Sequence, residues 1–124
     1  MARYIDAFVI PIRKKNLKAY KKMAQLGCKV WMDHGALQYV ECLGEDLVET
    51  MGLPFPKGLK LKKDETVVFS WILYASKKKR DAVNAKVMKD KRLLSMMAEG
   101  QAMPFEMKRM MHGGYLPRSP RLAQ

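Results

Sequence analysis

Residues that build metal centres and disulfide frameworks are scarce in this sequence, which has 2 cysteines and 2 histidines among its 124 residues. Cys28 and Cys42 belong to no CxxC pair and no cysteine–histidine cluster. We therefore predict neither a metal site nor a disulfide scaffold. In a reducing compartment both cysteines are expected to be free and partly buried. No cofactor is expected, and the sequence has no P-loop, dinucleotide fingerprint or nucleophile elbow.

Long apolar runs are also missing. One of the longest, Val67–Ala75, is broken by Ser70 and is far shorter than the roughly 20 residues of a membrane-spanning helix. The segment Met1–Asp6 has no charged stretch leading into an apolar one, so we expect no secretory signal and a cytoplasmic protein without a membrane partner. Hydrophobic residues still make up 48% of the chain. This favours a single two-layer domain over residues 1–116 and a frayed tail over 117–124.

Acidic residues are half as frequent as basic ones, with 12 Asp and Glu against 24 Lys and Arg and a net charge of +12. Such an excess suits nucleic acid or another polyanion. It equally suits an ordinary solvated surface. We favour the surface, because the lysines of segment 14–29 fall on the outer side of an amphipathic helix and no aromatic residue lies among them to stack on bases.

A strand–helix–strand pattern occurs twice along the chain. Strands are predicted at 4–11, 36–42, 65–74 and 109–116, and helices at 16–34 and 76–90. Asn16 and Ser76 are candidate N-caps, Gly35 can end the first helix, and a kink or a fresh cap is expected at Asp90. The order β-α-β-β-α-β predicts an α+β, ferredoxin-like domain, in which two helices cover one face of a four-stranded antiparallel sheet.

The predicted strands are apolar on both faces, which two helices on one side do not explain. In segment 66–74, Val67, Phe69, Trp71 and Leu73 share one face, while Val68, Ile72 and Tyr74 share the other. A strand that is apolar on both sides needs cover on both sides. A second copy of the sheet would provide it, so we predict a homodimer. The connection 43–64 is too long for a hairpin and is expected to be a lid, a binding loop or an oligomer arm.

Several short strings resemble one bacterial family over nearly the whole chain. They are KKNL at 14–17, VWM at 30–32, HGAL at 34–37, KKDETVVFSWI at 62–72, VNAKVM at 83–88, MPF at 103–105 and KRM at 108–110 followed by Gly113-Gly114. Together they resemble the YbaA-like family, a domain of unknown function. The resemblance implies membership of the dimeric α/β-barrel superfamily, which agrees with the two-sided strands. The chain departs from the family's usual pattern at Lys91, at His112 and in its high positive charge.

The candidate site residues are few. His34 and His112 are weak candidates for a general base, and the alternative for His34 is a role at the helix end. Trp31, His34, Trp71 and Met110 are a candidate ligand pocket, with core packing as the favoured alternative for the tryptophans. Arg80 and Asn84 lie four residues apart on a helix and are a candidate anion site.

Three functions remain open at this stage. The first is a dimeric barrel that binds or transforms a small aromatic or carbonyl molecule between helices and sheet. The second is a basic module for RNA or another polyanion, whose binding would weaken steeply with salt. The third is a structural or regulatory dimer without catalysis, and whether the protein is an enzyme is left undecided.

Overall fold

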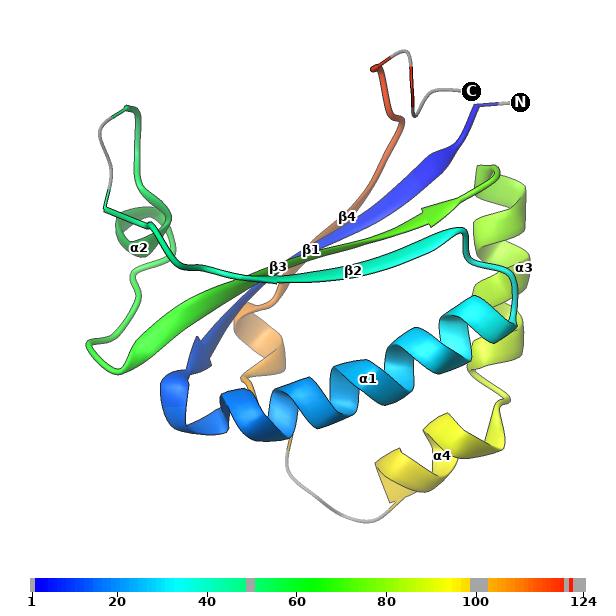
Figure 1. The fold of residues 1–124 in the computed structure, drawn as a ribbon, viewed down its shortest axis with the longest axis horizontal. Coiled ribbons are helices and arrows are strands. Elements are labelled where there is room, and N and C mark those ends of the chain that lie inside the picture. The colour runs from blue at the N-terminus through cyan, green and yellow to red at the C-terminus, as the bar shows by residue number, and fades with distance from the viewer. Residues whose placement is uncertain (1, 49–50, 99–102, 120, 122–124) are drawn as a thin grey trace.

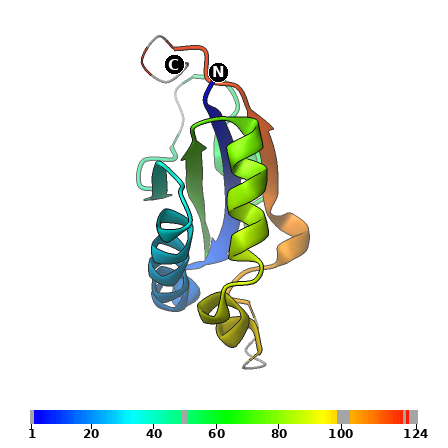
Figure 2. The same cartoon turned by 90° about the vertical axis from the view of Figure 1, so that its right-hand side faces the viewer.

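The computed structural model describes residues 2–48, 51–98, 103–119 and 121, and it contains a four-stranded sheet with three of its helices on one side (Figures 1 and 2). The strands are β1 (Tyr4–Arg13), β2 (Gln38–Leu43), β3 (Glu65–Tyr74) and β4 (Met111–Tyr115). The helices are α1 (Leu17–Asp33), α2 (Phe55–Gly58), α3 (Lys77–Val87) and α4 (Lys91–Ala98), with 3-10 turns η1 (Lys14–Asn16) and η2 (Met107–Arg109). Part of the predicted tail, 120 and 122–124, lies outside the described residues.

The strands are ordered β2-β3-β1-β4, and all three neighbouring pairs are antiparallel. The two long central strands pair over ten residues, from Tyr4 opposite Tyr74 to Arg13 opposite Glu65. Helices α1 and α3 lie side by side against the same face of the sheet (Figure 2). The predicted α+β, ferredoxin-like class is confirmed.

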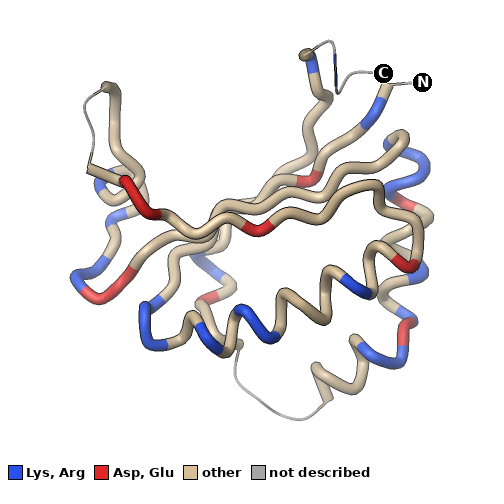
Figure 3. Tube along the Cα trace, in the orientation of Figure 1, with Lys and Arg blue, Asp and Glu red and all other residues tan. Residues whose placement is uncertain are grey.

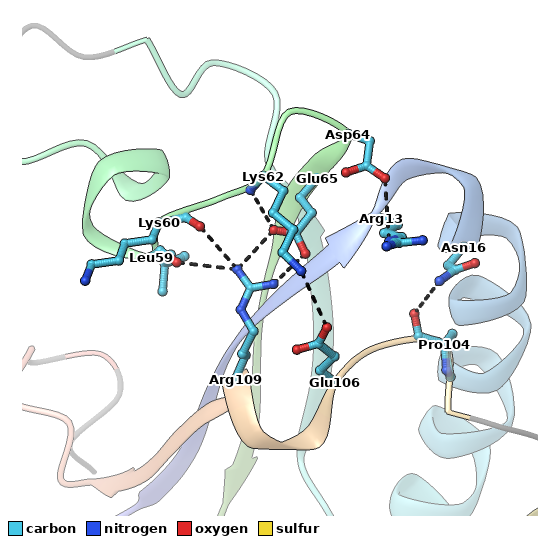
Figure 4. Close-up of polar contacts among 10 residues, drawn as sticks. All are labelled: Arg13, Asn16, Leu59, Lys60, Lys62, Asp64, Glu65, Pro104, Glu106 and Arg109. Atoms are coloured by element: carbon cyan, nitrogen blue, oxygen red, sulfur yellow. Dashed lines mark hydrogen bonds and ion pairs between the residues drawn. The ribbon is translucent and has the colours of Figure 1, made fainter.

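The helix ends follow the predicted caps in three of four places. Ser76 caps α3, because its Oγ accepts a hydrogen bond from the Lys79 amide at 3.1 Å. Gly35 follows α1 with a φ of +117°, which a glycine adopts without strain. At Asp90 the chain breaks and starts α4, since the Asp90 carboxylate accepts from the Arg92 amide at 2.8 Å. The prediction for Asn16 is wrong, because its side chain caps no helix and donates instead to the Pro104 carbonyl at 3.0 Å (Figure 4).

The core lies between the helices and the sheet and contains two groups of buried side chains. One group joins α1, α3 and α4 to the sheet through Val30, Ala36, Ile72, Tyr74, Val83, Val87 and Leu93. The other joins the first half of α1 to the centre of the sheet through Ile10, Ile12, Tyr20, Ala24 and Val68. The outer side of α1 is exposed and carries lysines, as its periodicity predicts, and Figure 3 shows Lys and Arg along this helix.

The opposite face of the sheet carries apolar side chains with uneven cover: Val67 and Leu73 are buried there, at 3% and 0% exposure, whereas others are half-buried or exposed. Ile5, Ala7 and Val9 of β1 are only half-buried there, and Phe69 of β3 is 41% exposed. Phe69 packs edge-on against Trp71, with 6.0 Å between the ring centroids. We call this surface the open sheet face. Its composition agrees with strands that are apolar on both sides.

The connection between β2 and β3 projects from one end of the sheet and contains the short helix α2 (Figure 1). Several of its apolar side chains face solvent, and Val48 and Met51 are 87% and 91% exposed. Its base is held by Arg109, whose guanidinium pairs with the Glu65 carboxylate at 2.5 and 3.0 Å (Figure 4). Arg109 also reaches the carbonyls of Leu59 and Lys60 at 3.5 Å. We call residues 44–64 the arm.

Three of the expected absences can be compared with the described part of the chain. No described helix is long and apolar enough to cross a membrane. No cluster of three or more potential metal ligands occurs among the described residues. Cys28 and Cys42 are both free; Cys28 is half-buried, whereas Cys42 is exposed.

Candidate functional site

His34 lies at the end of α1 and is engaged in an ion-pair network. Its Nε2 is 2.7 Å from Oδ2 of Asp90, and the same carboxylate receives the Arg92 guanidinium at 2.8 Å. Arg92 also reaches Asp33 at 2.7 Å. Hydrogen bonds from Arg92 and His34 hold the pKa of Asp90 well below its usual range. The network joins the end of α1 to the start of α4, which is the helix-end role weighed for His34.

His112 is placed on edge strand β4, opposite Phe8 of β1. Its ring stacks on the Phe8 ring with 5.2 Å between centroids and 29° between planes, and the residue is exposed. The geometry gives His112 an aromatic neighbour and no carboxylate partner among the described contacts.

The four residues of the predicted ligand pocket do not meet. Trp31 donates its Nε1–H to Asn84 at 3.1 Å on the helix side of the sheet. Trp71 lies on the open sheet face, where its Nε1 is 3.5 Å from Gln38 Oε1. Met110 packs against the core group that contains Ile10 and Tyr20. The prediction of a single pocket lined by Trp31, His34, Trp71 and Met110 is therefore wrong, because strand alternation places Trp71 on the other side of the sheet.

Arg80 and Asn84 lie on α3, but each has other partners. The Arg80 guanidinium donates to buried Asp6 at 2.6 Å and to Asp81 at 2.8 Å, and lies over the Tyr4 ring at 4.8 Å. Asn84 Oδ1 accepts from Trp31 at 3.1 Å and from the Tyr74 hydroxyl at 3.3 Å. The structure thus shows a carboxylate, Asp6, in contact with Arg80 where an anion was predicted.

A groove between α1 and β2 holds none of the predicted pocket residues. Its volume is about 450 Å³. Its lining is mostly apolar and comes from Leu17, Tyr20, Lys21, Ala24, Gln25, Cys28, Tyr39, Glu41, Cys42, Leu43 and Val68. We call it the Glu41 groove.

Gly27 helps to shape this region by letting the Tyr39 side chain approach α1 closely. A Cβ atom at position 27 would lie 2.7 Å from the Tyr39 hydroxyl oxygen. That separation is shorter than non-bonded atoms tolerate, so only glycine fits without movement of Tyr39. The ring of Tyr39 also packs against Trp31, with 6.0 Å between centroids.

The polar centre of the groove is the carboxyl group of Glu41. The Tyr20 hydroxyl donates to Glu41 Oε1 at 2.8 Å. The Tyr39 and Ser70 hydroxyls lie near enough to this carboxyl group to lower its pKa. Burial raises the pKa of Glu41, although the three hydroxyls oppose that rise. Burial and the neighbouring Glu41 charge also raise the pKa of Tyr20 and of Tyr39.

No cationic side chain neutralises this carboxyl group in the part of the chain that the structure describes. The eight ion pairs among the described residues do not include Glu41. No described Lys or Arg nitrogen lies within 4 Å of a Glu41 oxygen. Lys21 of α1 lines the same groove, but its nitrogen lies more than 4 Å from the Glu41 oxygens. A carboxyl group with hydroxyl neighbours and a raised pKa can hydrogen-bond a ligand or exchange a proton with it.

Sequence reasoning did not single out Glu41, although the sequence carries a signal. Glu41 and Tyr39 are two residues apart in a predicted strand, so they share a face. In the register of β2 with β3 they lie opposite Ser70 and Ile72, on the helix-covered side. An acidic residue on the inward face of a strand requires a partner. Tyr20 lies on the buried face of the predicted helix, so its hydroxyl is a candidate partner for the Glu41 carboxyl group.

Comparison with known proteins agrees with the resemblance read from the sequence. Residues 3–107 match the family described as "Protein of unknown function (DUF1428)". The uncharacterised protein YbaA of Escherichia coli K12 is 39% identical over 113 residues, which cover 91% of this chain and 94% of that protein. YbaA of Shigella flexneri matches to the same extent.

The fold is also similar to a solved structure of low sequence identity. This is a crystal structure of a NIPSNAP family protein of unknown function from Agrobacterium tumefaciens. The TM-score is 0.59 at 15% identity, with 95% of this chain and 92% of the other covered. At that identity the similarity concerns the fold alone.

Proposed function

The chain belongs to the DUF1428 family of proteins of unknown function, and from that premise we propose that it binds a small aromatic or carbonyl molecule in the Glu41 groove. The observation that carries the proposal is one carboxyl group, hydrogen-bonded by tyrosine hydroxyls, in an otherwise mostly apolar groove of about 450 Å³. Small-molecule sites are commonly about 300–1,000 Å³ and combine apolar walls with a few placed polar groups.

The lining favours a planar or partly apolar ligand. Tyr20 and Tyr39 bring aromatic rings to the groove, and Leu17, Leu43 and Val68 supply aliphatic surface. A bound aromatic ring gains from such contacts through burial and ring–ring packing. A carbonyl or hydroxyl on the ligand would be oriented by the Glu41 carboxyl group and its neighbouring hydroxyls.

A binding experiment with defined probes tests the proposal. Phenylpyruvate and phenylacetone are titrated into the ¹⁵N-labelled protein, and amide shifts are followed by NMR. The expected shifts concentrate on α1 and β2 around the groove. Cys28→Phe would fill the groove and abolish them. Met32→Phe is the matched control, because Met32 lies one turn further along the same helix, is exposed and does not line the groove. Shifts that persist in Cys28→Phe, or no shifts with either probe, contradict the proposal.

We further propose that the functional unit is a homodimer in which the open sheet face meets its copy. Support comes from the half-exposed apolar residues on that face, among them Ile5, Val9 and Phe69. The exposed apolar side chains of the arm, Val48 and Met51, provide further surface for a second copy. Burying such surface is favourable at about 25 cal/mol per Å². The expected result is a dimer in light scattering at micromolar concentration.

The other two functions stay predictions. A polyanion partner rests on the net charge of +12 and on the lysines along α1. A non-catalytic regulatory dimer would use the same open sheet face without needing the groove. The cytoplasmic location likewise stays a prediction. The groove favours a small molecule, because a carboxyl group at its centre would repel a phosphate backbone.

A further inference from the structure

We propose that Glu41 is a general base that removes a proton from the carbon next to a carbonyl group of a molecule bound in the Glu41 groove. The inference rests on the proposed function and adds a reaction to it. It commits to a substrate class, a carbonyl compound with an aromatic or other apolar substituent and an acidic C–H bond beside the carbonyl.

The position of Glu41 suits this task. Its carboxyl group lies on β2 and lines the groove, and Tyr20 of α1 holds one of its oxygens at 2.8 Å. An ionised carboxylate offers about four lone-pair positions. The Tyr20 hydroxyl uses one of them, and even with the neighbouring hydroxyls of Tyr39 and Ser70 at most three are used. The carboxylate therefore keeps capacity to accept a proton from a ligand while its neighbours fix its orientation.

The surroundings of Glu41 make it a stronger base than an exposed glutamate. Burial penalises its charged form and raises its pKa. No described lysine or arginine within 4 Å offsets that effect by pairing with the carboxylate. A base whose pKa moves toward neutral pH accepts protons more effectively in the transition state.

The step balances without an added reactant. The C–H bond beside the carbonyl breaks and its proton bonds to a Glu41 oxygen. The electron pair left on carbon forms the C=C bond of an enolate, whose charge rests on the former carbonyl oxygen. Return of the proton to the oxygen or to a carbon of the conjugated system regenerates the Glu41 carboxylate and yields an enol or an isomer. Neither an oxidant nor a reductant is needed.

The same groove provides groups that favour the enolate. Lys21 lines it from α1 with a positive charge that would attract the enolate oxygen. A net charge of +12 also gives the protein a potential that stabilises a developing negative charge. The titratable groups that line the groove on the same side as Glu41 are Tyr20, Lys21 and Cys28 from α1 and Tyr39 from β2, while Cys42 is next to Glu41 on the strand and points to the other face.

Proton–deuterium exchange provides the test, with the probes phenylpyruvate and phenylacetone in D₂O. Loss of the ¹H NMR signal of the C–H bond beside the carbonyl is followed with the full-length protein and without it. Wild type is expected to accelerate exchange by about 100-fold or more, which is the usual contribution of general base catalysis. Glu41→Gln is expected to return the rate to that of buffer. Glu45→Gln is the matched control, because Glu45 is an exposed acid four residues away, outside the groove.

The variant Tyr20→Phe tests whether Tyr20 positions the Glu41 carboxyl group or only stabilises the fold. It keeps the ring but removes the hydroxyl that donates to Glu41 Oε1. That hydrogen bond lowers the pKa of Glu41, so its loss moves the rise of the exchange rate with pH to higher pH. A purely structural role for Tyr20 would change stability and leave this midpoint in place.

The outcomes separate failure of this inference from failure of the proposed function. If the probes shift groove amides but wild type exchanges no faster than buffer, or no faster than folded Glu41→Gln, Glu41 is not a base and the binding proposal stands. If the probes do not bind, the proposed function fails first. If Glu41→Gln does not fold, the pH dependence of the exchange rate in Tyr20→Phe is the deciding measurement. A midpoint of that pH dependence equal to the wild-type midpoint overturns the inference.

Discussion

At the scale of single residues, buried polar groups in this protein are matched by specific partners. Among the described residues, no buried side-chain nitrogen or oxygen lacks a hydrogen-bond partner. Asn84 illustrates the pattern, since one carbonyl oxygen accepts from both Trp31 and Tyr74 and ties α3 to α1 and β3. Glu65 and Arg109 do the same for the arm and the segment before β4. Such pairs hold elements at defined positions, because either partner left alone in the interior would lose its solvation.

The Glu65–Arg109 pair leads to a prediction on pH. Hydrogen bonds from Arg109 lower the pKa of Glu65 below its ordinary value of 4.5. The stability that this ionised carboxylate contributes is therefore fully present above about pH 4.5 and is lost as pH falls through the lower, folded-state pKa. Urea denaturation of Glu65→Gln at pH 7 is expected to show a loss of roughly 2–3 kcal/mol, less than for a fully buried pair, because the Arg109 side chain remains 22% exposed.

Below pH 4.5 the difference between Glu65→Gln and wild type is expected to shrink. Glu45→Gln is the control, since it removes an acid that is exposed and makes no described ion pair. A gap between Glu65→Gln and wild type that stays constant from pH 7 to pH 3 would show that the carboxylate does not contribute as the geometry indicates.

At the scale of elements, helix ends in this chain coincide with polar side chains that reach across elements. Asp90 separates α3 from α4 and caps α4, while its carboxylate also holds His34 at the end of α1. Leu93 of α4 is buried in the same core group as Val30 of α1. One aspartate thus starts a helix and fixes where that helix packs.

Replacement of this aspartate should loosen α4 first. In Asp90→Ala the α4 amides lose their cap and His34 and Arg92 lose their shared partner. Hydrogen exchange of the amides from Arg92 to Leu94 is expected to accelerate, with a lower urea midpoint for the whole domain. Asp46→Ala is the control, because Asp46 is exposed on the arm and has no described partner. Equal exchange rates in the two variants would rule out the capping role.

At the scale of the whole molecule, the sheet divides the chain into a covered side and an open one. The helices and the Glu41 groove lie on the covered side, whereas Phe69 and Trp71 lie on the open sheet face. The arm extends beyond the sheet with its own exposed apolar residues (Figure 1). One copy of the chain therefore leaves part of the open sheet face uncovered, although Leu47 and Phe55 of the arm lie beside Val67 and Phe69 there.

A charge placed on the open sheet face should separate the proposed dimer. Phe69→Lys introduces a lysine at the centre of that face, where burial against a second copy would leave it without a partner. Light scattering is expected to shift from dimer to monomer. Met88→Lys is the control, since Met88 is exposed to a similar degree on the helix side. A monomeric wild type, or a dimeric and folded Phe69→Lys, contradicts the placement of the interface.

The parts of the fold that follow from local patterns were predictable, and the site was not. The β-branched and aromatic run in segment 65–74 placed β3 with the observed bounds, and Ser76 and Gly35 marked true helix ends. Asn16 failed as a cap because a carbonyl 88 residues away, that of Pro104, is its partner. Trp31 and Trp71 failed as a pocket because the sheet lies between them. In both cases a partner far along the chain decided what the side chain does.

What the sequence by itself determined is the order of elements, the face that each apolar side chain shares and the family to which the chain belongs. These follow from periodicity and capping, which act within a few residues, and from strings of residues that relatives share. Only the tertiary structure decided that the hydroxyls of Tyr20, Tyr39 and Ser70 come close to the carboxyl group of Glu41. They come from α1, β2 and β3, and the packing of α1 across the sheet brings the three together, since the energetics of a buried carboxyl group depend on contacts distant in sequence.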